Sequence, residues 1–368
     1  MQFIDLKRQY LELKEKINSG IQDVLNHGKY IMGPEVFTLE QNLSKFTDSK
    51  YVVSCSSGTD ALLMALMSLG VKSGDYIITS PFTYIATSEV MSLLGAIPKF
   101  VDIDPKTFNI DIEKLELEIN KAPDKYKVIM PVNIFGLPAN FTDLDDLKKK
   151  FNLVVIEDAA QSFGASINKK LSCSFGDIGC TSFFPAKPLG CYGDGGAIFT
   201  DNEEISDTLK SIRVHGTGSD KYDNVRVGIN GRLDTIQAAI LIPKLEVFSK
   251  EIELRNIVAN NYSKRLNNSF ELQEIPEGYI SSWAQYSILC DSKEHRDTII
   301  KKLDTKNIPS AIYYRIPLHL QKVYSYLNYQ KGDFPISEDV SSRIISLPMH
   351  PYLTQDETEL ICDVILGE

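Results

Sequence analysis

Cysteine is scarce in this chain of 368 residues. The six cysteines are Cys55, Cys173, Cys180, Cys191, Cys290 and Cys362. None of them forms a Cys-x-x-Cys pair or stands with histidine at the spacing of zinc ligands, so we predict no metal site. A chain of this size with so few cysteines is not built on a disulfide framework. We expect buried or half-buried thiols in a reducing compartment.

Long apolar runs and an excess of basic residues are also missing. No apolar run reaches the roughly 20 residues that a membrane helix needs. The first eight residues, MQFIDLKR, have no apolar stretch behind a basic start, as a signal peptide would. Lysine and arginine number 39 against 49 aspartates and glutamates, a net charge of −10, which disfavours nucleic acid and membrane surfaces as partners. We expect a cytoplasmic protein. The negative net charge does not exclude a local basic pocket that binds one anionic ligand.

Strand-like and helix-like segments alternate over much of the chain. The predicted strands are residues 51–54, 76–79, 98–101, 128–132 and 153–156, and the helices between them are residues 59–69, 85–94, 112–119 and 144–151. Such alternation predicts an α/β fold with a mostly parallel sheet that is covered by helices on both faces.

The pattern changes toward the C-terminus. The other predicted elements are strands at 179–184, 197–200 and 282–289, and helices at 205–213, at 294–303 and from 233 through 255 and beyond. Pro243 is a point where the long helix could kink. With mass for about two to three domains, the chain is expected to form a large domain at 1–245, which starts with a helical segment, and a smaller α+β domain at 246–368.

Small polar residues follow the first predicted strand, where ligands of open α/β sheets bind. Ser56, Ser57, Gly58, Thr59 and Asp60 open the next helix. Small residues allow backbone N–H groups to approach an anion, and the helix dipole favours negative charge, which suits a phosphate. Capping of the helix by Ser57 or Thr59 explains the same residues equally well.

Asp158 follows the buried segment 153–156, with Gln161 one helical turn further on. A carboxylate at this place could hold a protonated heterocyclic nitrogen. Taken alone, an aspartate here is better explained as the N-cap of a helix.

Lys187 lies between two prolines in an apolar, glycine-rich loop at 185–196. Desolvation in such a loop lowers the pKa of a lysine and makes it a nucleophilic amine, fit for a Schiff base. The alternative is an ordinary surface lysine, which the apolar neighbours disfavour. An anion cradle, an acid and an amine are together what pyridoxal phosphate needs.

The chain resembles the DegT family of nucleotide-sugar aminotransferases over nearly its whole length. The matching motifs are GKYIMGPE at 28–35, SGTDAL at 57–62, PFTY at 81–84, EDAAQ at 157–161, the Lys187 loop and GINGRLD at 228–234. This resemblance implies the aspartate-aminotransferase-like fold, fold type I of the pyridoxal phosphate enzymes. It also implies a homodimer with shared active sites and L-glutamate as amino donor.

The resemblance assigns the chemistry to three residues. Lys187 would form the Schiff base and then move a proton between substrate and cofactor. Asp158 would pair with the pyridine nitrogen of pyridoxal 5'-phosphate, and Gln161 would contact its ring hydroxyl.

Five further residues would hold the cofactor, again by resemblance. Gly58, Thr59 and Ser182 would bind the phosphate. Tyr84 would stack on the ring. Asn230 would reach the phosphate from the neighbouring subunit, which makes the dimer necessary for activity.

Substrate contacts are assigned to Arg232, Tyr313, Tyr314, Arg315 and His319. Aromatic and basic side chains suit a sugar nucleotide, since arginine binds oxyanions through two hydrogen bonds. An exposed strand edge explains the Tyr-Tyr-Arg run almost equally well, and a lone histidine is usually structural.

Several stretches, 180–200, 283–286 and 346–352, are most similar to aminotransferases that act on UDP-2-acetamido-2-deoxy-3-oxo-D-glucuronate in O-antigen and other lipopolysaccharide pathways. Those enzymes tend to have histidine and proline where this chain has Tyr313 and Arg315. Arg315 could therefore pair with a uronate carboxylate or with the diphosphate, and Arg232 is a second candidate for the carboxylate.

Other activities remain as alternatives. A neutral UDP- or dTDP-keto sugar could be the acceptor, or the fold could serve as a sensor or regulator without catalysis. A sugar dehydratase would have histidine in place of Lys187. A desulfurase would use Cys191, but no basic neighbour is at hand to activate that thiol.

Overall fold

The structure, a computed structural model, describes residues 1–220 and 222–368. Its strands are β1 (Tyr51–Cys55), β2 (Tyr76–Thr79), β3 (Ile97–Phe100), β4 (Tyr126–Ile129), β5 (Val154–Asp158), β6 (Ser166–Ile167), β7 (Lys170–Leu171), β8 (Ile178–Ser182), β9 (Gly196–Thr200), β10 (Glu271–Leu272), β11 (Tyr279–Ile280), β12 (Tyr286–Leu289) and β13 (Ile344–Leu347). Its α-helices are α1 (Leu6–His27), α2 (Pro34–Thr47), α3 (Gly58–Ser68), α4 (Ala86–Leu93), α5 (Ile112–Lys121), α6 (Phe141–Phe151), α7 (Glu203–Ile212), α8 (Thr235–Leu266), α9 (Lys293–Thr305), α10 (Pro335–Arg343) and α11 (Gln355–Leu366). Short 3-10 helices are η1 (Pro123–Lys125), η2 (Ile134–Gly136), η3 (Leu318–Leu320) and η4 (Lys322–Leu327).

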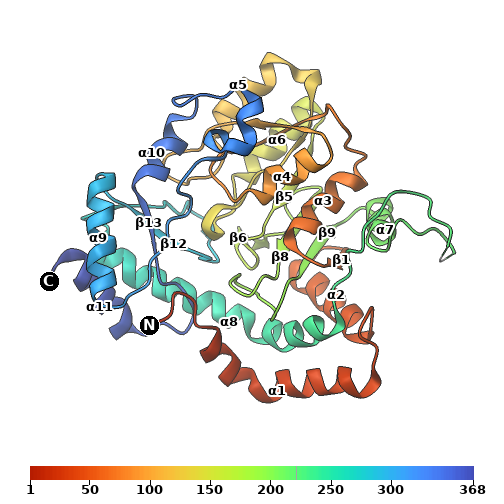
Figure 1. Ribbon diagram of the computed structural model, residues 1–368, viewed down its shortest axis with the longest axis horizontal. Helices are drawn as coiled ribbons and strands as arrows, with labels where there is room; N and C mark the ends of the chain where they lie inside the picture. Colours follow the sequence, from red (N-terminus) through yellow and green to blue (C-terminus); the bar gives the residue numbers. More distant parts are fainter. Residues whose placement is uncertain (221) are drawn as a thin grey trace.

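The main sheet has seven strands in the order β1-β9-β8-β5-β4-β2-β3. Neighbours from β8 through β3 pair in parallel, whereas β9 runs antiparallel to both β1 and β8. All its strands except β9 therefore point their carboxyl ends to the same edge. The predicted α/β fold with a mostly parallel sheet is confirmed (Figure 1).

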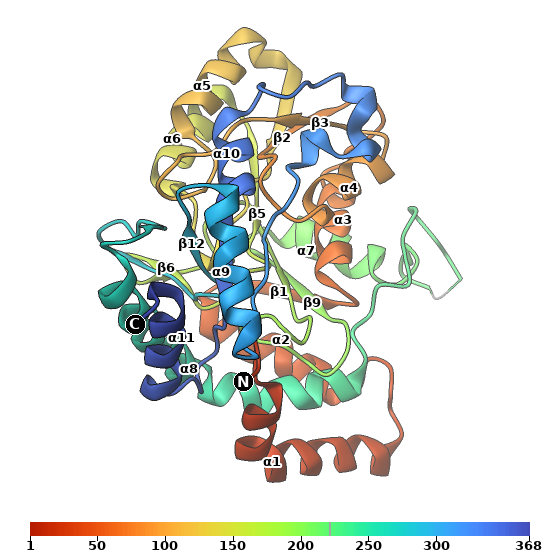
Figure 2. The ribbon, with the colours of Figure 1, turned by 60° about the vertical axis from the view of Figure 1, so that its left-hand side comes forward.

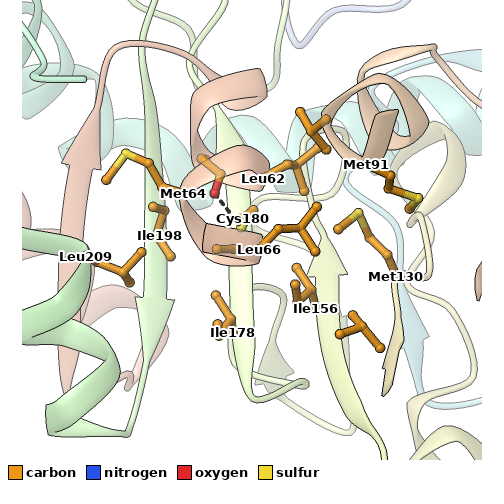
Figure 3. Close-up of a cluster of buried hydrophobic side chains, with 14 of the residues drawn as sticks. Leu62, Met64, Leu66, Met91, Met130, Ile156, Ile178, Cys180, Ile198 and Leu209 are labelled. Atoms are coloured by element: carbon orange, nitrogen blue, oxygen red, sulfur yellow. Dashed lines mark hydrogen bonds between the residues drawn. The ribbon is translucent and has the colours of Figure 1, made fainter. Parts of the chain in front are cut away.

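Helices cover both faces of this sheet because successive residues of a strand point to opposite sides. On one face, α3, α4 and α7 pack apolar side chains onto the strands (Figure 3). Ile156 and Ile198 belong to that cluster, whereas their strand neighbours Val155 and Phe199 pack on the opposite face, which α2, α5, α6 and α8 cover. Helix α3, the helix predicted at 59–69, contributes five buried side chains to this cluster, Ala61, Leu62, Met64, Ala65 and Leu66.

Helix α8 runs from the main sheet into a second core. It continues through Pro243 without a break in the helix. Its first half packs below the main sheet, and its last turns join α9, α11 and the small sheet β10-β12-β13 in a separate cluster (Figures 1 and 2). The predicted domain boundary after residue 245 thus falls inside this helix, and the division at 245/246 stays a prediction.

The predicted strand at 282–289 is wrong over its first half, since β12 covers only Tyr286–Leu289. The N–H groups of Ser282 and Gln285 instead donate to the carbonyls of Gly136 and Phe135 in η2. Trp283 between them has a positive φ of 46°. Contacts with a distant loop, which local sequence does not reveal, replace the ladder of hydrogen bonds there.

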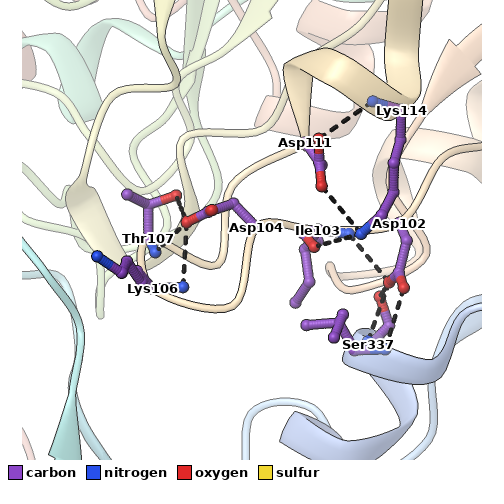
Figure 4. A network of polar contacts seen from close by, with 9 residues as sticks. Asp102, Ile103, Asp104, Lys106, Thr107, Asp111, Lys114 and Ser337 are labelled. Carbon is purple, nitrogen blue, oxygen red and sulfur yellow. Dashed lines mark hydrogen bonds and ion pairs between the residues drawn. The ribbon is translucent and has the colours of Figure 1, made fainter. Parts of the chain in front are cut away.

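A buried carboxylate ties α10 to the main sheet. Asp102 follows β3 and accepts hydrogen bonds from the backbone N–H groups of Ile336 and Ser337, each at 3.0 Å, and from the Ser337 hydroxyl at 2.6 Å (Figure 4). A carboxylate at a helix N-terminus is favoured by the free N–H groups and by the helix dipole. This contact fixes the C-terminal segment across the carboxyl edge of the sheet.

Candidate active site

The register of the sheet brings the predicted phosphate cradle together. Cys55 lies opposite Gly196 on β9, and Gly196 lies opposite Ser182 on β8, so three strand ends form one row. The start of α3 packs directly on this row, because a Cβ atom added to Gly58 would stand 2.6 Å from the Cβ of Ser182. Only glycine fits at this position, and the predicted partners Gly58 and Ser182 are in contact.

The first turn of α3 combines a cap with free donors. The Ser57 hydroxyl accepts from the N–H of Asp60 at 3.0 Å, so the capping role expected for Ser57 is confirmed. The N–H groups of Gly58 and Thr59 have no acceptor within the described part of the chain. Two unpaired donors at a helix N-terminus, with no side chain between them and Ser182, can bind an oxyanion.

Asp158 ends β5 as a buried carboxylate. The hydroxyl of Thr87 donates to it at 2.7 Å and the N–H of Ala160 at 3.2 Å. Burial raises the pKa of Asp158, and the two donors and the positive charge of Lys187 oppose that rise. A turn rather than a helix follows, so the N-cap explanation, and with it the helical spacing expected for Gln161, is wrong. A buried carboxylate that caps no helix favours a cationic partner.

Lys187 sits in a loop that folds back on itself after β8. Its N–H donates to the Phe184 carbonyl at 2.8 Å. The N–H of Phe183 donates to the Gly195 carbonyl at 2.7 Å, and the Phe183 carbonyl accepts from the N–H of Cys191 at 2.8 Å. Burial lowers the pKa of Lys187, and the negative charge of Asp158 opposes this shift. No described residue forms an ion pair with its ammonium group. The Lys187 loop follows β8, the neighbour of β5 in the sheet, so the predicted amine and the predicted acid come from adjacent strand ends.

Gln161 connects the turn after β5 with the C-terminal segment. Its carbonyl oxygen accepts from the N–H of Phe135 at 2.8 Å, and its amide donates to the hydroxyl of Tyr314 at 3.0 Å. Tyr314 is in turn packed edge-on against Phe82. The structure thus brings Gln161 and Tyr314, predicted for cofactor and substrate, into direct contact.

A groove of about 570 Å³ opens beside this contact. Its lining includes Tyr84, Tyr314, Arg315, Leu320 and Lys322. Tyr84 is 59% exposed, and Arg315 is exposed as well. The groove brings an aromatic ring and two cationic side chains together beside Tyr314, as an anionic substrate with a flat ring would require.

Asn230 and Arg232 lie together at the surface. The guanidinium of Arg232 donates to the Asn230 side-chain oxygen through Nε at 3.1 Å and Nη2 at 2.6 Å. Their segment passes the phosphate cradle, since the Gly231 carbonyl accepts from the N–H of Ser56 at 3.0 Å. Asn230 is exposed, as a residue that reaches a neighbouring subunit would be.

Three of the five residues assigned to substrate do not line the groove: Tyr313, His319 and Arg232, the last of which bonds Asn230. Tyr313 is half-buried and packs edge-on against Phe3. His319 is buried, contacts Phe334 and bonds Glu338 through Nε2 at 3.0 Å. The structure therefore gives His319 a packing role, and none of the three side chains joins the lining with Tyr84 and Tyr314.

The thiol of Cys191 is unsuited to a desulfurase. It is buried, and its one S–H is shared between the carbonyls of Phe183 and Gly193, which lie 3.0 and 3.1 Å from Sγ. Burial raises its pKa to about 11. The described residues also contain no group of three or more histidine, cysteine, aspartate or glutamate side chains that could hold a metal.

Sequence reasoning missed Thr87. This threonine lies on α4, is buried and donates the shortest hydrogen bond that Asp158 receives. The motif at 81–84 marked the neighbourhood, but only the packing of α4 shows that Thr87 turns toward β5.

Comparison with known proteins agrees with this geometry. A model of the DegT/DnrJ/EryC1/StrS aminotransferase family matches residues 11–366. The chain belongs to this family. Its fold is that of the family's solved structures, so this DegT-family protein is an aminotransferase, and the fold expected from the sequence is confirmed.

Three relatives illustrate the range of names within the family. This DegT-family chain is 46% identical, over 98% of both chains, to the UDP-2-acetamido-2-deoxy-3-oxo-D-glucuronate aminotransferase of Pseudomonas aeruginosa. It is 37% identical to the UDP-N-acetyl-3-dehydro-alpha-D-glucosamine 3-aminotransferase of Acidithiobacillus ferrooxidans, over 98% of this chain and 96% of that one. It is 36% identical to a pleiotropic regulatory protein of Geobacillus stearothermophilus, again over 98% and 96%.

Two solved structures match across the whole chain. A DegT DnrJ EryC1 StrS aminotransferase from Brucella abortus has a TM-score of 0.95 and 45% identity, covering 100% of this chain and 99% of that one. The Bacillus subtilis protein ntda with bound cofactor PMP has a TM-score of 0.91 and 30% identity, covering 100% and 84%. Within residues 1–220 and 222–368, no helix is both long and apolar enough to cross a membrane.

Proposed function

We propose that this protein transfers the amino group of L-glutamate to a keto-sugar nucleotide, with pyridoxal 5'-phosphate as cofactor. One observation carries the proposal: the buried Asp158, the desolvated Lys187 and the Gly58–Ser182 cradle meet at one edge of the sheet. The nitrogen moves from Cα of glutamate to the keto carbon of the sugar, and glutamate leaves as 2-oxoglutarate. The exchange is redox-neutral overall.

The residues present fit this cofactor. The N–H groups of Gly58 and Thr59, with Ser182, would bind its phosphate. Asp158 would pair with the protonated ring nitrogen, which supplies the positive charge that a buried carboxylate lacks. The related structure with bound PMP, the pyridoxamine form, supports the choice of cofactor. When bound, the cofactor supplies an electron sink for the bond to Cα.

The neighbouring residues would orient the cofactor. Gln161 has one amide hydrogen beyond its bond to Tyr314 and could reach the ring hydroxyl. Tyr84, exposed in the groove, would stack on the ring. Asn230 would act on the site of the partner subunit in a homodimer, since its side chain is exposed on its own chain.

Lys187 would carry the proton transfers. Burial lowers its pKa, so a larger fraction of the amine is neutral near pH 7 than for a solvated lysine. A neutral amine near Asp158 can take a proton from substrate Cα and return it in the next step. Thr87 and the N–H of Ala160 favour the ionised form of Asp158 by donating to it, against the effect of burial.

UDP-2-acetamido-2-deoxy-3-oxo-D-glucuronate is the acceptor we propose, converted to its 3-amino product for a surface polysaccharide such as O-antigen. The 46% identical relative that carries this substrate in its name supports the choice. Arg315 in the groove, or Arg232, would bind the uronate carboxylate, and the remaining cation the diphosphate. We place the reaction in the cytoplasm.

A neutral sugar is the competing acceptor, because the 37% identical relative is named for one. In the test, the enzyme is incubated with pyridoxal phosphate, glutamate and either the 3-oxo uronate nucleotide or the 3-oxo-GlcNAc nucleotide. Mass spectrometry then detects the 3-amino product. Amination of the uronate alone is the expected result. Amination of the neutral sugar alone would overturn the proposed substrate but not the proposed aminotransferase activity.

The name of the regulatory relative raises a role without catalysis. Glutamate alone distinguishes it, because an aminotransferase must release one equivalent of 2-oxoglutarate per loaded site without any acceptor. No release with any amino donor would favour the sensor. Lys187 itself disfavours a dehydratase.

A further inference from the structure

Helix α8 carries a lysine that is fully buried beside the Lys187 loop. The ammonium of Lys244 donates to the carbonyl of Gly190 at 2.6 Å. It also lies 4.1 Å from the ring centroid of Tyr192, at cation–π distance. Gly190 and Tyr192 follow Lys187 by three and five residues, so Lys244 holds the far side of the loop that presents Lys187.

A second side chain on the same helix face holds the same stretch. Gln237 precedes Lys244 by seven residues, two helical turns. Its side-chain oxygen accepts from the N–H of Tyr192 at 2.9 Å, and its amide donates to the Tyr192 carbonyl at 3.4 Å. A Cβ atom added to Gly193 would stand 2.9 Å from that amide. Both the backbone N–H and the backbone carbonyl of Tyr192 are thus bonded to α8.

Contacts within the loop connect the anchored residues Gly190 and Tyr192 to Lys187. A Cβ atom added to Gly190 would stand 2.5 Å from the carbonyl oxygen of Pro185, so these two parts of the loop touch. The N–H of Lys187 closes a turn onto Phe184, next to Pro185. A shift of Gly190 away from Lys244 would therefore displace the backbone from which the Lys187 side chain extends.

Burial of the Lys244 ammonium at this position costs free energy of folding. Lys244 forms no ion pair with any described residue. The negative charge of Glu251, two turns further along α8, acts on Lys244. The side chains of Gln9 and Tyr352 already donate hydrogen bonds to that carboxylate. Burial lowers the pKa of Lys244 to about 8, against the attraction of Glu251. A buried, unpaired cation costs stability relative to an apolar side chain of similar size.

We propose that Lys244 is a positioning residue, which with Gln237 holds the Lys187 loop against α8 so that the amine of Lys187 faces Asp158. This inference rests on the proposed function, because the placement of the Lys187 amine matters only if that amine binds the cofactor. The contacts it invokes belong to the protein without cofactor and can be tested there.

Hydrogen exchange of the cofactor-free protein is the first measurement. In Lys244→Met, two amide hydrogens should exchange at least about tenfold faster. One belongs to Cys191, whose peptide carries the Gly190 carbonyl that Lys244 holds, and the other belongs to Lys187, further along the loop. Gln237→Leu should produce the same local increase and serves if Lys244→Met does not fold. Lys250→Met, which removes an exposed lysine of the same helix that pairs with Glu253, should leave both amides within about twofold of wild type.

The second measurement is the rate of covalent capture of pyridoxal phosphate by Lys187, followed by mass after reduction. We expect it to fall at least tenfold in Lys244→Met and in Gln237→Leu, and not in the Lys250→Met control. Wild-type exchange at Lys187 and Cys191, or an increase spread evenly over α8 and the core, would overturn the positioning role. Failure of the wild type itself to capture the cofactor would contradict the proposed function, while the exchange experiment would still decide the role of Lys244.

Discussion

The side-chain amide of Gln161 donates a 3.0 Å hydrogen bond to the hydroxyl of Tyr314, 153 residues further along the chain. Gln161 belongs to the turn after β5, and Tyr314 to the segment that lines the groove. Both side chains thus link the edge of the main sheet, where the cofactor is proposed to lie, to the proposed substrate groove.

Replacing Tyr314 should expose the contribution of this link. Tyr314→Phe leaves a buried amide hydrogen of Gln161 without an acceptor, which should reduce the free energy of unfolding by about 1–2 kcal/mol. Urea unfolding of the cofactor-free protein measures this loss. Tyr326→Phe is the control, because the Tyr326 hydroxyl bonds Ser92 at the surface and its loss should matter little. Equal stabilities of the two variants would contradict the role of the link.

Gly58 should tolerate alanine only when Ser182 makes room. The added Cβ would stand 2.6 Å from the Cβ of Ser182, and overpacking of this kind costs about 1–3 kcal/mol. Ser182→Gly removes the clashing atom, so the double variant should regain part of the loss, with a coupling energy of about 1 kcal/mol or more. Strictly additive effects in urea unfolding would show that the two residues do not touch.

Cys191 should be inert in the native protein. A thiol with a pKa of about 11 is almost entirely protonated at pH 8, and both carbonyl acceptors hold it in place. Iodoacetamide should modify it only after unfolding in urea, as peptide mass spectrometry can measure, and Cys191→Ala should keep transamination within about threefold. Rapid alkylation of Cys191 in the folded protein would reopen the desulfurase alternative.

The ion pair between Arg8 and Glu357 should make stability depend on acid pH. The hydrogen bonds from Arg8 lower the pKa of Glu357 from its ordinary value of 4.5 to about 2. A carboxyl whose folded pKa is depressed stabilises the fold above the unfolded value and loses this contribution as pH falls toward the folded one. Glu357→Gln keeps the helix cap, so it should be less stable than wild type at pH 7, and the difference should shrink between pH 4.5 and 2. A constant difference in urea unfolding over that range would contradict the pairing.

Much of the main sheet was predictable because its strands are short apolar runs followed by small polar residues. Predicted segments such as 76–79 and 197–200 coincide with β2 and β9 to within one residue. The same local signals led to Gly58, Asp158 and Lys187, since Asp158 ends a strand and the other two lie in the segments that follow one. The site could be assembled from sequence to that extent because parallel strands bring their ends to one edge.

What sequence could not supply depends on contacts between distant segments. Nothing near residue 282 shows that its N–H bonds η2 rather than a neighbouring strand. His319 follows a Tyr-Tyr-Arg run that suits a ligand, yet the chain turns its ring inward onto Glu338. Thr87 and Lys244 look like ordinary helix residues until the packing of α4 and α8 places them against Asp158 and Gly190.

Borohydride reduction of the protein with pyridoxal phosphate tests the central claim most directly. The reductant fixes the cofactor to the amine that holds it, and peptide mass spectrometry then identifies that lysine. The account predicts one pyridoxyl group per chain on the peptide that contains Lys187, and none in Lys187→Ala, which should still fold. A pyridoxyl group on Lys244 or another lysine, or none on the wild-type protein, would contradict it.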